Sequence, residues 1–311
     1  MPPRSVLIGA ATRERAALTA LFAGAIAIAF SPIFVRLSEV GPTASAFYRP
    51  ALAFPALFVW LAFERPGSRR GAVESARRGP ARRPSVRDRS GLVLAGIFFA
   101  GDLAFWHWSI TFTSVANSTL FANFAPLFVT LGAFALFGER VRPAFLAGLA
   151  VALAGTVLLM GQSLSFGPTP LLGDALGLVT AVFYAAYMLT VSRLGAVFTT
   201  ATIVTWSAGV TALTLLPVAW ISGESLAVTT LHGWAMLLGL ALVSHAGGQS
   251  LIAYALAHLP ATFSSVALLV QPGAAALVAW VLLDEPLGPL QAAGGAVILG
   301  GILIARRASR A

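Results

Sequence analysis

The sequence predicts an all-α integral membrane protein with ten transmembrane helices, arranged as two inverted repeats of five helices. Three observations support this prediction. The 311 residues are 58% hydrophobic and only 10% charged, with a mean hydropathy of +0.86, which excludes a water-soluble globule. Apolar stretches of about 20 residues, enough to cross a bilayer, follow one another along the chain. Residues 107–159 and 253–305 also match without gaps at a shift of 146 residues.

The helices are expected, in chain order, wherever a long apolar stretch lies between polar segments. The first follows Arg15 and is too long for a secretory signal, because it continues to Arg36 without a small-residue cleavage site. The polar stretch 64–90 separates the second from the third, and GPTPLLGD and ISGESL are loops in the second half. The ten predicted ranges are 16–37, 43–63, 91–110, 114–137, 142–160, 171–193, 198–221, 232–257, 261–283 and 287–305.

The internal match divides the chain into halves 1–160 and 161–311, and it relates helices three to five to helices eight to ten. Arg36 and Arg193, at the ends of helices one and six, align at a shift of 157, so the first half has eleven extra residues (157 minus 146) near the stretch 64–90. Because five is odd, the two halves must insert with opposite orientations. The matched pairs are Ser118/Ser264, Pro126/Pro272, Leu131/Leu277, Leu136/Leu282, Glu139/Glu285, Pro143/Pro289, Gly148/Gly294, Leu153/Leu299 and Gly155/Gly301.

The arginines predict the orientation of the chain. With ten spans and a cytoplasmic N-terminus, eighteen of the twenty arginines fall on the cytoplasmic side, and only Arg36 and Arg49 do not. Both termini are therefore expected in the cytoplasm and the spans in the cell (inner) membrane. The formal net charge of +9 reflects this asymmetry rather than nucleic-acid binding. The stretch 64–90 is expected to be a mobile basic cytoplasmic loop, with contact to anionic lipids as the alternative.

The composition excludes several kinds of chemistry. The chain has no cysteine and no lysine, which excludes disulfides, thiolate metal sites, a Walker A phosphate loop and a Schiff base. No close carboxylate pair, histidine cluster or Asp-rich motif lies within the predicted spans. We therefore expect no enzyme activity, no cofactor and no metal. The expected partners of a monomeric chain are a small-molecule substrate and membrane lipids.

Two blocks share a proline midway along the fourth helix of their half, a glutamate at its end and a glycine-bearing closing helix. They read APLFVTLGAFALFGERVRPAFLAGLAVALAGTVLL and QPGAAALVAWVLLDEPLGPLQAAGGAVILGGILIA. In these blocks the chain resembles the EamA family of the drug/metabolite transporter (DMT) superfamily. The resemblance implies an exporter or exchanger of small organic metabolites with a central cavity, most similar in layout to YddG-type amino-acid exporters. Where many members have a Trp-Gly pair in helix one, this chain reads Ala29-Phe30-Ser31-Pro32, so no family contacts are transferred there.

Ionisable and polar residues at mid-depth are candidates for a transport pathway, because such groups are costly next to lipid. Asp102 lies in the third helix and His245 in the eighth, its repeat counterpart, and either could carry a proton during transport. Trp106 and Ser109 share a helical face with Asp102, and Gln249 lies one turn beyond His245 on the face of that residue. The alternative is that Asp102 accepts interhelical hydrogen bonds and that His245 is a packing residue.

Neutral amides and phenols can bind an amino or carboxylate group, although they equally suit hydrogen bonds between helices. Arg49 is a candidate for binding a carboxylate, or else it extends to the headgroups. Trp106 and Trp206, with nearby phenylalanines, suggest an aromatic cavity wall. Pro126 and Pro272 are expected to bend their helices, because proline lacks a backbone donor. The predicted substrate-binding residues are Trp106, Ser109, Asn117, Phe121, Asn123, Tyr184, Tyr187, Trp206, His245, Gln249 and Gln271, and the proton-coupling candidates are Asp102 and His245.

The sequence thus favours a secondary transporter that exports small neutral amino acids, including hydrophobic or aromatic ones, or related metabolites by alternating access. Proton-coupled export of lipophilic drugs is the alternative within the same class, because Asp102 is the sole deep acidic residue. A channel, a lipid scramblase and a membrane enzyme are further alternatives. A channel would show flux without stimulation by counter-flow, and a scramblase would move lipids.

Overall fold

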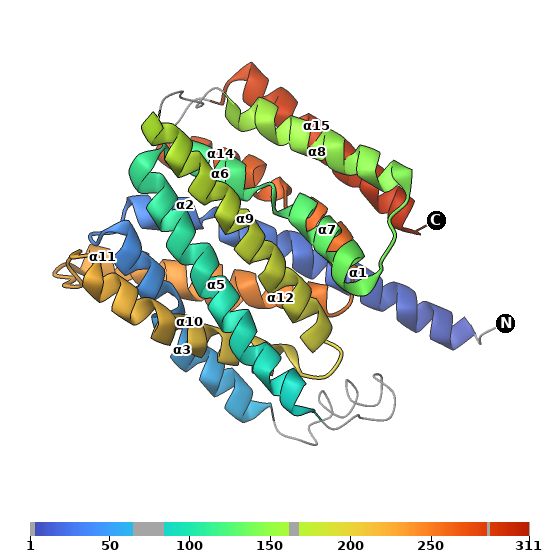
Figure 1. Cartoon of the computed structure of the whole chain (residues 1–311), viewed down its shortest axis with the longest axis horizontal. Coiled ribbons are helices and arrows are strands. Elements are labelled where there is room, and N and C mark those ends of the chain that lie inside the picture. The colour runs from blue at the N-terminus through green and yellow to red at the C-terminus, as the bar shows by residue number, and fades with distance from the viewer. Residues whose placement is uncertain (1–3, 65–83, 162–167, 285–286, 311) are drawn as a thin grey trace.

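The computed structural model describes residues 4–64, 84–161, 168–284 and 287–310. Ten segments within these ranges are helical, long and apolar enough to cross a membrane, which confirms the predicted fold class. Both ends of the chain lie on the same side of the bundle (Figure 1). We call this side the terminal face and the other side the opposite face. The elements are α1 Arg4–Ala29, α2 Ser31–Arg36, α3 Pro42–Phe63, α5 Val86–Phe112, α6 Val115–Ala122, α7 Ala125–Phe137, α8 Pro143–Met160, α9 Pro168–Leu194, α10 Thr200–Ile221, α11 Leu231–Gly239, η2 Leu240–Gln249, α12 Ser250–Leu256, α13 Ala261–Ala267, α14 Val270–Leu283 and α15 Pro289–Arg310.

Most helix boundaries fall within two residues of those predicted, but four helices are longer, and α9 begins at Pro168, three residues before the predicted start. α1 begins at Arg4 instead of residue 16, and α15 continues to Arg310 instead of 305. α5 begins at Val86, five residues before the predicted start, because Ser85 and Asp88 form a capping box that satisfies the first backbone N–H groups. Residues 86–90 of the predicted loop are therefore helical, and residues 65–83 lie outside the described ranges.

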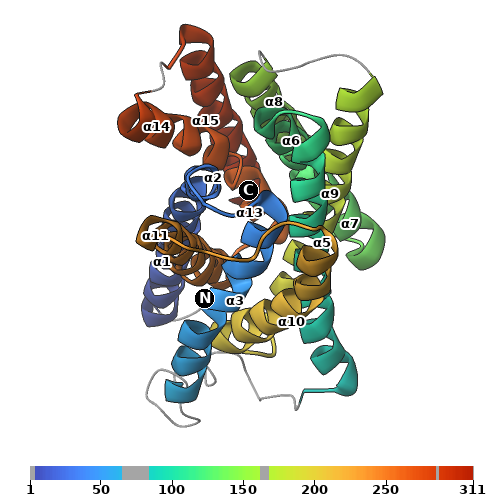
Figure 2. The same ribbon diagram turned by 90° about the vertical axis from the view of Figure 1, so that its left-hand side faces the viewer.

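Helices of the two repeats interleave, so neither half forms a separate bundle. α5 packs along α9, α3 along α10, and α1 along η2, α12 and α14. Each of these contacts joins a helix of the first repeat to one of the second. Figure 2, which views the opposite face, shows α3 and α10 at the bottom, α14 and α15 at the upper left, and α6 and α8 at the upper right.

The closing helices α8 and α15 show directly that the repeats are inverted. They lie side by side (Figure 1), and their repeat-matched glycines meet in reverse order. A Cβ atom at Gly155 would lie 2.6 Å from Ile298 N and 2.9 Å from Gly294 O, and one at Gly148 would lie 2.9 Å from Gly301 O. Only glycine allows the two backbones to come this close. The pseudo-twofold axis of the repeats passes through this antiparallel pair.

The fourth helix of each repeat is interrupted at equivalent positions. α6 ends at Ala122 and α7 begins at Ala125, and α13 and α14 are likewise separated between Ala267 and Val270. Pro126 lies in the first turn of α7, and Pro272 lies in the first turn of α14. Each proline lacks the N–H that a continuous helix would donate, so the preceding turn ends. These breaks bring Asn123 and Gln271, which flank them, close to the centre of the bundle.

The eighth span is not a uniform α-helix. Its central ten residues, Leu240–Gln249, form a π-helix between α11 and α12. π-helical turns place side chains differently from α-helical turns and are frequent at functional sites. The predicted α-helical stripe through His245 and Gln249 therefore does not describe this segment.

Candidate functional site

A cavity lies between the two repeats, from the middle of the bundle toward the opposite face. The space open to the centres of water-sized molecules is about 170 Å³. The first repeat contributes residues of α1, α2, α3, α5 and α6, and the second contributes residues of α9, η2 and α14. Toward the terminal face, α1, α3 and α5 pack with α10 and α12 in a continuous apolar core that includes Leu21, Leu57, Leu92, Ile203 and Ile252. The cavity is thus closed by side chains on the terminal side.

Arg49 and Asp102 place one positive and one negative charge on the cavity wall. Arg49 is seven residues from the start of α3 and Asp102 ten residues from the end of α5, about 10 and 15 Å along their helices from the opposite face. The guanidinium carbon of Arg49 lies 5.7 Å from the centre of the Phe99 ring, and the two charges interact electrostatically. Arg49, which the sequence left between two roles, is turned inward rather than toward the headgroups.

Several polar atoms of the cavity wall are buried and have no hydrogen-bond partner in the protein. They include Ser31 Oγ, Arg49 Nε, His107 Nε2, Gln249 Nε2 and Gln271 Nε2. The side chain of Gln249 is only 3% exposed. Leaving such groups unpaired is unfavourable, so they form a site prepared for a polar ligand or for water.

His107 presents a hydrogen-bond acceptor to the cavity. Its Nδ1 atom lies 2.6 Å from the carbonyl oxygen of Leu103, which can only accept, so Nδ1 carries the proton. In the neutral ring Nε2 then has the free lone pair, and this buried atom has no partner. His107 is not among the residues predicted from the sequence. The signal was available, since it is an ionisable residue within a span, five residues beyond Asp102.

Two tyrosines of α9 support the same wall. Tyr184 lines the cavity, and its ring stacks on that of Tyr187 with 6.1 Å between the centres. Tyr187 is buried behind it, 4.8 Å from the ring centre of Phe99. The side chain of Gln249 interacts with the phenol groups of both tyrosines. The phenols and the amide thus form a polar cluster around mid-depth.

The structure brings seven of the sequence-predicted residues to the cavity. They are Asp102, Trp106, Asn123, Tyr184, Gln249, Gln271 and Pro272. Asn123 donates from its side-chain amide to the carbonyl oxygen of Thr119, at 2.7 Å. Trp106 and Phe99 supply aromatic surface beside these polar groups.

The remaining predicted residues lie elsewhere. Ser109 donates to the carbonyl oxygen of Gly173, 2.6 Å away, and joins α5 to α9. Phe121 stacks on Phe124, with 6.2 Å between ring centres. Asn117 is completely buried with both side-chain polar atoms unpartnered, away from the cavity wall. Pro126 is buried in α7 and is not part of the wall.

Two predicted residues of the second repeat also stand apart from the cavity. Trp206 lies on the outer surface of α10, with 52% of its surface exposed. It is therefore no part of the expected aromatic wall. His245 is buried, and its ring lies 5.4 Å from that of Phe99 with Nδ1 unpartnered. Phe99 lines the cavity, and His245 does not.

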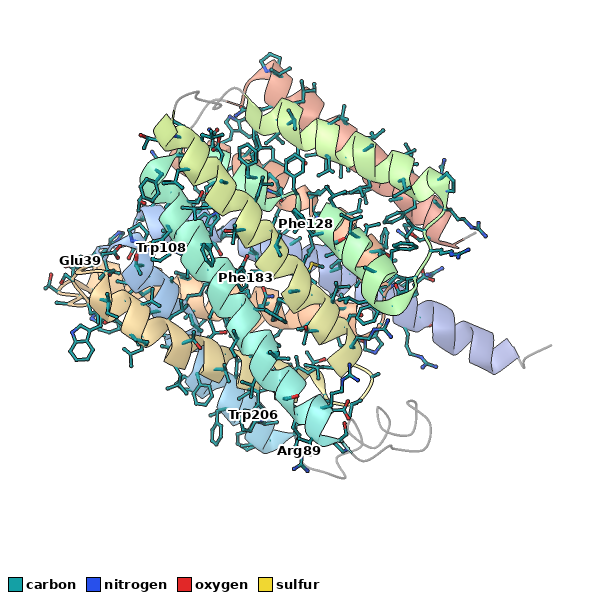
Figure 3. All side chains as sticks on the ribbon, viewed as in Figure 1. Glu39, Arg89, Trp108, Phe128, Phe183 and Trp206 are labelled. Carbon is teal, nitrogen blue, oxygen red and sulfur yellow. The ribbon has the colours of Figure 1, made fainter. Side chains whose placement is uncertain are left out.

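Carboxylates connect the two repeats on the opposite face, where Glu39 lies at one end of the bundle (Figure 3). Glu224 accepts hydrogen bonds from the N–H groups of Thr43 (3.2 Å) and Ala44 (2.9 Å), at the start of α3. Glu39 accepts hydrogen bonds from the backbone N–H and hydroxyl groups of Thr229 and Thr230. The Thr229 hydroxyl and then the Thr230 N–H are the main groups that lower the pKa of Glu39 to about 2.

On the terminal face, Glu139 forms an ion pair with Arg193, with 3.0 Å between the charged atoms. Arg193 also lies over the ring of Phe137 at 3.6 Å. This pair braces the end of α7 against α9, whereas the matched Glu285 lies outside the described residues. Within the described ranges, no three His, Asp or Glu side chains gather as a metal-binding group.

Ten spans in two inverted repeats around a mid-membrane cavity define a membrane transporter. The sequence matches the EamA-like transporter family over residues 15–161 and 171–307, which is most of the chain. The chain therefore belongs to the EamA-like transporter family, within the drug/metabolite transporter superfamily.

Relatives with a named activity are exporters. The chain is 29% identical over 229 residues to a probable terminal-alkyne amino-acid exporter of Streptantibioticus cattleyicolor, covering 73% of this chain and 76% of the relative. It is 27% identical over 208 residues to the pseudopaline exporter CntI of Pseudomonas aeruginosa, covering 67% and 72%. A solved crystal structure with 20% identity superimposes with a TM-score of 0.73, covering 94% of this chain and 97% of that one, and supports the fold.

Proposed function

We propose that this transporter exports small neutral amino acids or related zwitterionic metabolites across the cell (inner) membrane, by alternating access at the cavity between the repeats. The distribution of arginines along the sequence supports a cytoplasmic location of both termini. The names of two relatives support amino-acid-like cargo. The observation that carries the proposal is a mid-membrane cavity, walled by both repeats, that combines apolar surface with unpartnered polar atoms.

The closed terminal half is one end state of the proposed cycle. The cavity extends toward the opposite face, whereas the apolar core blocks the route to the terminal face. Cargo from the cytoplasm would enter after the repeats rearrange about the α8–α15 axis. Trp106 and Phe99 would contact an apolar side chain, and Gln249, Gln271, Asn123 and Tyr184 would hydrogen-bond the polar end of the cargo.

Purified full-length protein in liposomes tests this function. We expect L-leucine or L-phenylalanine uptake to be stimulated by unlabelled amino acid on the other side, because a carrier exchanges cargo. Flux that follows the gradient without counter-flow stimulation would indicate a channel. Absence of uptake for all neutral amino acids, in protein shown to be folded, would contradict the proposal.

A proton gradient imposed on the same liposomes separates the coupling candidates. Asp102 lies on the cavity wall, while His245 packs behind Phe99, so we expect any gradient-dependent uptake to be lost in Asp102→Asn and retained in His245→Ala. Unchanged gradient dependence in both variants would remove both residues from a coupling role.

Export of lipophilic cations is the second candidate, supported by an acidic residue beside aromatic rings in the cavity. The guanidinium of Arg49 on the same wall opposes a cationic cargo. Uptake of tetraphenylphosphonium that depends on Asp102 would favour this alternative over amino-acid export.

A further inference from the structure

The cavity carries a pattern of charge that selects among small polar molecules. Among the described residues of its wall, Arg49 and Asp102 are the two with a formal charge. Their opposite charges leave the wall neutral when both are ionised. A cargo with one positive and one negative group can pair with both residues. A cation is repelled by Arg49, and an anion is repelled by Asp102.

We infer that Arg49 binds the carboxylate and Asp102 the ammonium of a zwitterionic cargo, so that these two residues determine the specificity of the transporter. This inference rests on the proposed function and names the residues that select its substrate. Both side chains line the same cavity, which offers only about 170 Å³ to the centres of water-sized molecules, so a small zwitterion placed there can contact both.

The polar groups beside Asp102 and Arg49 also suit the ammonium and the carboxylate of such a cargo. An ammonium group has three donors, and α5 offers two acceptors, Asp102 and the free Nε2 of His107. A carboxylate needs donors, and Arg49 Nε is buried without a partner. The guanidinium fork can bind a carboxylate through two parallel hydrogen bonds, while Phe99 supports its plane.

Without cargo, the charges of Arg49 and Asp102 on the cavity wall attract each other. A zwitterion replaces that attraction by two separate pairs, whereas a molecule with one charge satisfies one residue and leaves the other unmatched in a desolvated site. Unpaired buried charges are strongly unfavourable. Discrimination therefore arises from the residue left unmatched as much as from the ion pair that the cargo forms.

Equilibrium binding to the purified full chain tests this inference with two probe sets. Each set contains the amino acid, its amide, which has only the positive charge, and its N-acetyl derivative, which has only the negative charge. L-leucine and L-phenylalanine are the two parent probes. We expect wild-type protein to bind at least one parent about tenfold or more tightly than both of its derivatives.

The variants should then show a crossed pattern. Arg49→Gln should abolish the preference for the amino acid over its amide, and Arg49→Lys should partly restore it. Asp102→Asn should abolish the preference over the N-acetyl derivative. Arg193→Gln, which removes a surface ion pair, and Asp174→Asn, whose carboxylate accepts a hydrogen bond from Thr113, serve as matched controls and should leave both preferences unchanged.

Two results would overturn the inference. Wild-type protein that binds the amides or N-acetyl derivatives as tightly as the parents would show that the charges do not select cargo. Variants that weaken all three probes of a set by the same factor would show that Arg49 and Asp102 only maintain the structure. If liposomes still exchange amino acids in either case, the proposed function stands while the assignment of these residues fails.

Discussion

Two pairs of repeat-related helices have diverged to very different extents. α8 and α15 are both regular helices, and their matched glycines meet across the pseudo-twofold axis. α5 and the eighth span are also counterparts, but α5 is a continuous α-helix whereas the eighth span contains the π-helix Leu240–Gln249. The symmetric pair contains no cavity-lining residue, while both members of the asymmetric pair contribute to the cavity.

The difference indicates how a duplicated chain separates assembly from recognition. An amino acid, the proposed cargo, has no twofold symmetry, so a site that fits it must place different groups on equivalent helices. α5 carries Asp102 and His107, whereas the π-helix carries Gln249 and places His245 against Phe99. The glycine contacts of α8 and α15 keep the repeats joined and are independent of the cargo.

The largest effect is expected where the symmetric pair is broken. A Cβ atom at Gly301 would collide with the backbone of Ala152, so Gly301→Ala should force α8 and α15 apart at a cost of about 1–3 kcal/mol. A Cβ atom added at Gly300 would have no neighbouring atom within 4 Å, so Gly300→Ala should be neutral or slightly stabilising. Thermal unfolding of the two purified variants compares them directly. Equal midpoints would show that this close contact does not contribute to stability.

A moderate effect is expected from the asymmetric pair. Gln249→Leu removes an unpartnered donor from the cavity wall and should weaken L-leucine counter-flow affinity by about 2- to 10-fold. His245→Phe keeps an aromatic ring against Phe99 outside the cavity and should change the affinity by less than about twofold. Concentration-dependent counter-flow measures both. An equal loss in the two variants would contradict the different roles assigned to these positions.

The sequence predicted the fold well because the controlling signals lie in the residue pattern itself. Span length and the 146-residue shift depend on neither side-chain direction nor packing. The glycine pairs Gly148/Gly294 and Gly155/Gly301 were visible as matched positions, and the structure shows that they meet crosswise, Gly148 with Gly301 and Gly155 with Gly294. The early start of α5 was missed, although Ser85 and Asp88 carry the spacing of a capping box.

The candidate site was predictable only in part, because depth in the membrane does not determine direction around a helix. Trp206 and Asp102 both lie deep in their spans, but one faces outward and the other inward. The π-helix was not visible in the residue pattern, so the side-chain directions of His245 and Gln249 could not be derived from α-helical spacing. Arg49 could be assigned to the cavity only from the structure, which places its guanidinium over the ring of Phe99 on another helix.

The smallest effect concerns how the two counterpart helices begin. In α5 the carboxylate of Asp88 accepts the N–H of Ser85, within the same helix. At the start of α11 the carboxylate that accepts the N–H of Thr230 belongs to Glu39 of the other repeat. Glu39→Gln should therefore increase amide exchange at both Thr229 and Thr230 on one side and the α2–α3 segment on the other, whereas Asp88→Asn should increase exchange at the start of α5.

The pH dependence sharpens this last comparison. Because the pKa of Glu39 is lowered from 4.5 to about 2, its contribution is fully present above pH 4.5 and is lost as the pH falls through about 2. The difference in exchange between wild type and Glu39→Gln should stay constant from about pH 5 to 8 and shrink below 4.5. Hydrogen exchange followed by mass spectrometry can measure it after correction for the intrinsic rates. A difference that disappears near neutral pH would show that the ionised carboxylate of Glu39 does not hold the two repeats together at this face.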